Sequence, residues 1–267
     1  MLKKRWLLGG AAVVVCGVLL FGSFIINRGQ RQESVTGVAK EKFVWDGVVR
    51  DTPVRVGTEG TISASMARSY NFIEAVIESD VVADITITSW MEELLISQDR
   101  DRGGCTFFNA KINYLYKGDA PDEIVIMQLG DNKWTHKNYP LFKNGDRLLL
   151  FLNGTNDMYD NSMYPDNMFW IPGSHTTVMD VYELDGILYS VDRWGIMTND
   201  KLGYIPEEER LNFNIVNEET RNFLHAHIDS IDPVLSEARR EYYENILFYD
   251  DVAKEIQNIL TKEGDLK

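Results

Sequence analysis

The chain has 267 residues, 44% of them hydrophobic, 11% aromatic and 25% charged, with only 7 prolines, which is the composition of a folded protein. This composition excludes a collagen-like, low-complexity or disordered chain. The 27 basic residues against 41 acidic residues give a formal net charge of -14, so nucleic acids and anionic lipid headgroups are poor partners.

The chain begins with a pattern typical of a membrane anchor. Residues 1–5 contain a basic cluster, and residues 6–26 form an apolar run without any charge. At about 1.5 Å rise per residue, such a run spans a bilayer core of roughly 30 Å. A cleaved signal peptide would have a shorter apolar region, followed by a pair of small residues that is missing here. We therefore predict an uncleaved, single-pass anchor at 6–26.

The charges beside this run predict its orientation. Lys3, Lys4 and Arg5 precede the run, whereas only Arg28 and Arg31 follow it closely. Positive charge favours the cytoplasmic side, so we expect residues 1–5 in the cytoplasm and the large domain outside the membrane. The two cysteines do not change this interpretation, because one lies within the apolar run and cannot pair with the other.

A polar tether and a short helix are predicted next. Residues 27–42 lack any apolar period and indicate a tether. Residues 65–79 carry apolar side chains at helical spacing after Ser65, which can cap a helix.

The middle of the chain has the period of strands. Apolar and polar residues alternate over 81–90 and again over 108–116, and a third strand is predicted at 123–129. The run at 147–153 is apolar on both faces, as in a central strand. Asp185-Gly186 between two apolar stretches is a strong hairpin signal. We predict a β-barrel domain over 43–205 with one short helix.

Four segments in this order carry a resemblance to a known group of proteins: ESDVVADITITSW, INYLYKGDAPDEIVIMQLG, PLFKNGDRLLLFLN and VYELDGILYS. Over residues 65–192 the chain resembles bacterial, membrane-anchored extracytoplasmic proteins whose domain is a small closed β-barrel of the OB or netrin-like kind. The resemblance implies an α+β fold: a transmembrane helix, a small closed antiparallel barrel with packed helices, and a helical C-terminal segment. Animal netrin-like protease inhibitors act through an N-terminal cysteine, which this chain lacks, so inhibition is not implied.

The C-terminal segment, residues 206–267, is predicted to be helical. Asp232-Pro233 is a typical helix start. After it, apolar residues recur every three or four positions through Ile246 and Tyr249 to Leu260. This stripe predicts one amphipathic helix, or two joined near Asp250-Asp251, packed against the barrel.

The motif LHAHID at 224–229 raises the question of a metal site. On a helix, His225 and His227 are about 200° apart and cannot bind one metal, whereas Asp229 can share a face with His225. We therefore predict no metal and no cofactor here. A cell-surface hydrolase, with His225 and Asp229 in a site formed only in three dimensions, stays the alternative.

The long connection at 156–173 is the strongest candidate for binding. It carries Tyr159, Tyr164, Phe169 and Trp170, and long loops on rigid barrels often bind ligands. The other possibility is that these aromatic residues fold back and plug the barrel end. The sequence thus favours a non-enzymatic, membrane-anchored, extracytoplasmic module that binds a protein or a small ligand of unknown identity.

Overall fold

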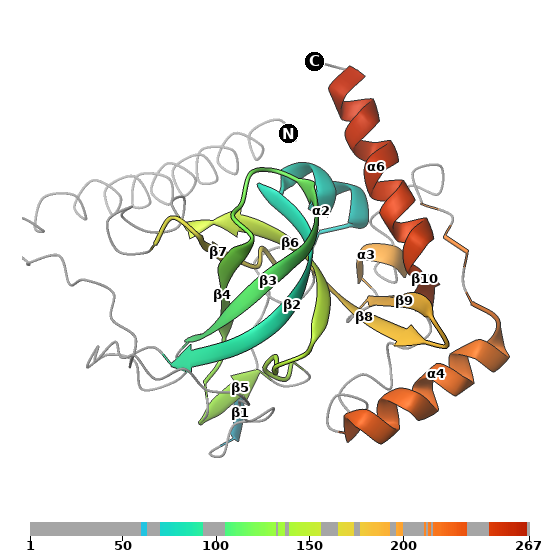
Figure 1. Cartoon of the computed structure of the whole chain (residues 1–267), viewed down its shortest axis with the longest axis horizontal. Coiled ribbons are helices and arrows are strands. Elements are labelled where there is room, and N and C mark those ends of the chain that lie inside the picture. The colour runs from blue at the N-terminus through green and yellow to red at the C-terminus, as the bar shows by residue number, and fades with distance from the viewer. Residues whose placement is uncertain are drawn as a thin grey trace, which may run out of the picture. The chain divides into compact units, whose positions relative to one another are not determined.

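A computed structural model of the chain describes part of its length (Figure 1). The described residues are 60–62, 70–92, 105–131, 133–136, 139–155, 165–173, 177–192, 196–199, 211, 213, 214, 216–233 and 246–265. All of them belong to the second of two compact units, residues 1–42 and 43–267.

Five strands close into a barrel. Their bounds are β2 Val81–Glu92, β3 Cys105–Lys117, β4 Glu123–Leu129, β6 Arg147–Gly154 and β7 Met168–Trp170. Strand β2 pairs antiparallel with β3 and β6, and β3 pairs antiparallel with β4. Strand β7 closes the ring, because it pairs with both β4 and β6. The predicted small closed barrel within an α+β fold is confirmed.

One pairing in the ring corrects the expectation of a wholly antiparallel barrel. Strands β4 and β7 run parallel, with Val125 opposite Met168 and Met127 opposite Trp170. Strand directions cannot alternate all the way around a closed ring with an odd number of strands. At least one neighbouring pair in a five-stranded barrel must therefore be parallel.

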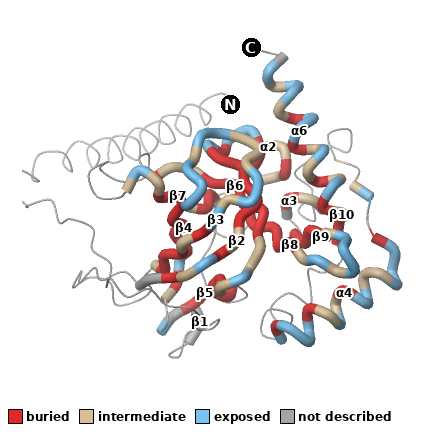
Figure 2. The backbone as a smooth tube through the Cα atoms, viewed as in Figure 1, coloured by how far each residue is buried: buried red, intermediate tan, exposed pale blue. Residues whose placement is uncertain are grey.

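The alternation along the strands builds the interior of the barrel. Side chains at every second position of β2, including Val81, Ala83, Ile85 and Ile87, point inward and are buried. Phe169 of β7 belongs to the same cluster. Figure 2 shows that buried residues concentrate on the barrel strands, whereas α4 and the far end of α6 are largely exposed.

Three further strands extend the sheet beyond the barrel. Strand β8 (Val178–Leu184) pairs with β6, then β9 (Ile187–Asp192) pairs with β8, and β10 (Ile246–Phe248) pairs with β9. The predicted hairpin turn between β8 and β9 is confirmed, with positive φ angles of 52° at Asp185 and 78° at Gly186. A separate pair joins β1 (Gly60–Ile62) in parallel to β5 (Trp134–His136).

Strand β10 corrects the prediction that Ile246 belongs to a helical stripe, formed by one helix or by two joined near Asp250-Asp251. Ile246 lies on this strand opposite Val191 of β9, and helix α6 begins at Tyr249 and ends at Asp265. The spacing of Ile246 and Tyr249 fits a helix locally. The free edge of β9 offers backbone hydrogen bonds, however, and Ile246 is fully buried there.

Helix α2 (Phe72–Glu78) is shorter than the predicted helix at 65–79 and is capped by Asn71 instead of Ser65. The Asn71 side chain accepts a hydrogen bond from the backbone N–H of Glu74, and the Glu74 carboxylate accepts one from the N–H of Asn71. At its other end, the Lys117 ammonium donates to the carbonyl of Val76. Ser65 lies outside the described residues.

Helices cover the outer face of one side of the barrel. Helices α2 and α6 and the short α3 (Ile196–Asn199) contribute Phe72, Met197 and Ile256 to a second core against outward-pointing residues of β2, β6 and β8. Helix α4 (Glu218–Ile231) packs Leu224 and Ile228 against β9 and β10. The prediction that the C-terminal helix packs on the barrel is confirmed.

Among the residues that the structure describes, no helix has both the length and the apolar character needed to cross a membrane. The predicted anchor at 6–26 and the predicted tether at 27–42 lie outside these residues.

Candidate functional site

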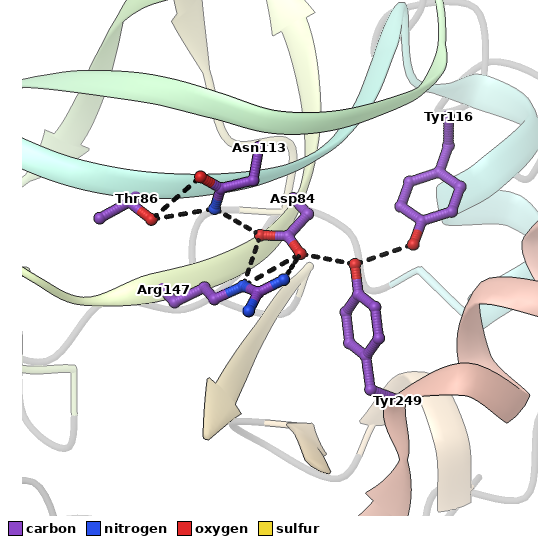
Figure 3. Close-up of polar contacts among 6 residues, drawn as sticks. All are labelled: Asp84, Thr86, Asn113, Tyr116, Arg147 and Tyr249. Atoms are coloured by element: carbon purple, nitrogen blue, oxygen red, sulfur yellow. Dashed lines mark hydrogen bonds and ion pairs between the residues drawn. The ribbon is translucent and has the colours of Figure 1, made fainter. Parts of the chain in front are cut away.

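A network of polar side chains joins the barrel to the first turn of α6 (Figure 3). Its members come from four elements that are far apart in the sequence. They are Asp84 and Thr86 of β2, Asn113 and Tyr116 of β3, Arg147 of β6 and Tyr249 of α6.

The carboxylate of Asp84 is the centre of this network and is fully buried. Arg147 donates to both carboxylate oxygens, through Nη2 at 2.6 Å and Nε at 3.0 and 3.1 Å. The hydroxyl of Tyr249 donates to Oδ2 at 2.6 Å, and Nδ2 of Asn113 donates to Oδ1 at 2.9 Å. Because Tyr249 uses its proton for Asp84, Tyr116 is the donor in the 2.8 Å contact between the two phenol oxygens.

A bulge in β3 brings Asn113 to this position. Asp84 pairs with Tyr114 and Ile85 pairs with Ile112, so Asn113 is the extra residue between two pairs. A bulge of this kind re-aims a side chain and increases the local twist. The amide of Asn113 can then donate to both Asp84 and Thr86 from the outer face of the barrel.

The electrostatics of the network keep the partners of Asp84 protonated. The hydrogen bond from Arg147 to Asp84 raises the pKa of the guanidinium. Burial, followed by the hydrogen bond to Asp84, raises the pKa of Tyr249, and burial raises the pKa of Tyr116. Both phenols therefore keep their protons at any physiological pH.

This arrangement is suited to holding the fold and not to proton transfer. Asp84 accepts hydrogen bonds from three side chains, so its lone pairs are occupied, and Tyr249 cannot act as a base. The Arg147 side chain is 31% exposed, and its guanidinium lies 5.6 Å from the centre of the Tyr249 ring. We interpret the network as a polar latch between α6 and the barrel.

Two of the four predicted ligand-binding residues lie on β7. Phe169 is 6% exposed and points into the barrel interior, so it contributes to the core. Trp170 points outward, is partly exposed, and its indole N–H donates to the carbonyl of Gly154 at 3.2 Å. Tyr159 and Tyr164 lie outside the described residues, so the role of the four as one binding site stays a prediction.

The histidine motif LHAHID lies within helix α4, as predicted. His225 is partly buried, whereas Asp229 is exposed. Across the described ranges, no group of three or more His, Cys, Asp or Glu side chains could hold a metal ion. The hydrolase alternative through His225 and Asp229 stays a prediction.

The barrel has a second outer face, formed by β3, β4 and β7, on the side away from α3 and α6 (Figure 1). Phe107, Met127 and Trp170 align across these three strands in register. With Val125 and Met168 they form an apolar cluster separate from the barrel interior. Cys105 and Trp170 at its edge are partly exposed, and Leu129 is 41% exposed.

Sequence reasoning found neither this outer face nor the latch. Strand β4 is apolar on both faces, so its alternation is weak. A strand with two apolar faces is typical of one that packs on both sides, and this was the signal in the sequence for the outer face. In an alternating strand, Asp84 has the position of a solvent-facing residue. Its hydrogen-bond partner Tyr249 is 165 positions away in the sequence.

Comparison of the chain with protein-family models, with curated protein sequences and with solved structures gave no match in any of the three.

Proposed function

We propose that this protein is a membrane-anchored, extracytoplasmic binding module, with a barrel of the OB or netrin-like kind that binds a protein or small ligand. The observation that carries this proposal is the apolar outer face of β3, β4 and β7, where Leu129 is 41% exposed and Cys105 and Trp170 are partly exposed. Outward-pointing apolar side chains on a strand are typical of a packing surface, whereas a solvated face is polar.

The topology of the barrel supports the OB-like assignment. The first barrel strand, β2, pairs with the second and the fourth, and the third runs parallel to the fifth. This is the strand arrangement of OB barrels. Such barrels bind ligands on the face of their second and third strands, which here are β3 and β4.

The rim of this face is the part that a partner would meet. Phe107, Val125, Met127 and Met168 are buried, so they support the surface and do not form its contact area. Leu129 is exposed, and Trp170 is partly exposed. The connection at 156–164, with the predicted binding residues Tyr159 and Tyr164, precedes β7 in the sequence and lies outside the described residues.

A pair of matched substitutions tests the binding face. Leu129 is 41% exposed on β4, and Ile187 is 47% exposed at the hairpin between β8 and β9. Leu129→Asp and Ile187→Asp should both leave the free energy of unfolding nearly unchanged, because exposed positions tolerate substitution. Only Leu129→Asp should reduce the mass of the complex that is extracted from membranes in mild detergent.

Two outcomes would contradict the proposed face. One is a wild-type protein that is extracted at the mass of a single chain and has no bound small ligand. The other is a complex that both substitutions weaken equally. The anchor is tested separately: protease added to intact bacterial spheroplasts should degrade the domain, whereas its protection would contradict the extracytoplasmic location.

A further inference from the structure

Helix α4 carries a second stripe beside the one that packs on the sheet. Leu224 and Ile228 are buried against β9 and β10, whereas Phe223 is 60% exposed and Ile231 is 50% exposed. Phe223, His227 and Ile231 are spaced four residues apart, so on a helix they lie within about 80° of one another. We call these three residues the α4 stripe. Figure 2 shows that α4 lies at the periphery of the domain, with exposed residues along its length.

The composition of the α4 stripe is that of a docking surface. Phe and Ile are among the side chains that are most often buried, and two of them on one exposed helix face mark a candidate interaction site. Amphipathic helices are recognised through apolar anchors at this spacing. The exposed Ala226 and Ser230 lie next to the anchors and are small, so another segment can approach the helix closely.

The charges of α4 define which partner fits. Glu218, Glu219 and Asp229 are exposed, and among the described residues no ion pair or hydrogen bond of their carboxylates is found. Arg221 is the only Lys or Arg of the helix, is partly buried, and lies about 160° around the axis from Phe223. The exposed side of α4 therefore combines apolar anchors with uncompensated negative charge.

We propose that the α4 stripe docks a basic amphipathic segment of another protein, which covers the anchors and places its cations against these carboxylates. Charge complementarity of this kind selects the partner and accelerates its association. A second copy of the chain fits less well, because it would bring the same carboxylates together and its net charge is also -14. An anionic membrane surface is repelled for the same reason. The α4 stripe is independent of the outer face of β3, β4 and β7.

Titration with three designed helical peptides tests the proposal. The full chain is reconstituted in phosphatidylcholine nanodiscs, and empty nanodiscs measure the binding of each peptide to lipid. The probe has Leu on one face and Lys on the other; one control replaces Lys with Glu, and the second replaces Leu with Ser. The probe should bind the protein at least about tenfold more tightly than either control. Equal binding of probe and controls, or probe binding no greater than that to empty nanodiscs, would overturn the proposal.

Substitutions on the helix locate the bound peptide. Phe223→Ser and Ile231→Ser, made separately, should leave the thermal melt nearly unchanged because both side chains are exposed, and each should weaken probe binding by at least about fivefold. Ile77→Ser, at a 40% exposed position on α2, is the matched control and should leave binding unchanged. Glu219→Gln should weaken probe binding, and added salt should reduce the difference between Glu219→Gln and wild type.

Two results with these variants would overturn the assignment. One is probe binding that neither Phe223→Ser nor Ile231→Ser reduces, which would place the peptide elsewhere on the protein. The other is a concentration-dependent association of the full chain, measured by sedimentation in detergent, that Phe223→Ser abolishes. That result would assign the α4 stripe to a second copy of the chain instead of a basic partner.

Discussion

The substitution Tyr249→Phe isolates one hydrogen bond of the latch between α6 and the barrel. It removes the hydroxyl that donates to Asp84 at 2.6 Å and keeps the ring, which is buried among the residues of the second core. A hydrogen bond to a charged group contributes about 1.5–3 kcal/mol. Asp84 keeps its bonds from Arg147 and Asn113, so its charge stays paired. We therefore expect the free energy of unfolding to fall by about 1.5–3 kcal/mol.

Tyr116→Phe is the matched control for this measurement. Its hydroxyl bonds the oxygen of Tyr249 and not the carboxylate, so its loss should cost only about 0.5–1.5 kcal/mol. Denaturant unfolding at neutral pH, followed by circular dichroism with an unchanged m-value, gives both numbers. The reasoning fails if Tyr249→Phe costs less than about 0.5 kcal/mol, or less than Tyr116→Phe.

Four further results are expected. The unfolded chain loses the Tyr249 proton from about pH 10 while the folded chain, in which burial raises this pKa, retains it. The stability advantage of wild type over Tyr249→Phe should therefore be constant below pH 10 and shrink above it, and an advantage that grows there would contradict this. Arg147→Ala leaves the buried Asp84 carboxylate without its cation and should cost about 3–5 kcal/mol, and a cost below about 1 kcal/mol would show that Asp84 does not need this cation. Phe169→Ala should also cost about 3–5 kcal/mol in a thermal or denaturant melt, because it opens a cavity in the barrel, and a near-native melt would place the ring outside the core. A chelator should leave the thermal melt unchanged, whereas a large shift would reveal a structural metal.

The elements that were predicted correctly are those that short-range patterns determine. The alternation of apolar and polar residues predicted β2 and most of β3, and Asp185-Gly186 predicted the turn between β8 and β9. Both signals come from residues that are close together in the sequence. The helical spacing around His225 and His227 likewise placed α4.

The features that were missed depend on tertiary contacts. Strand β7 has only three residues inside a long connection, and it becomes a strand because it fits between β4 and β6. Strand β10 forms because β9 has a free edge. The latch joins Asp84 to residues 63 and 165 positions later, and no local pattern distinguishes a buried aspartate from a solvated one.

Crosslinking in intact cells tests the binding module most directly. A photoreactive phenylalanine derivative would replace Leu129 on the proposed face or Ile187 on the hairpin, which are similarly exposed. The proposal predicts that position 129 gives a discrete crosslinked species of higher mass and that position 187 does not. Crosslinks at both positions, or at neither, would contradict a specific binding face on β3, β4 and β7.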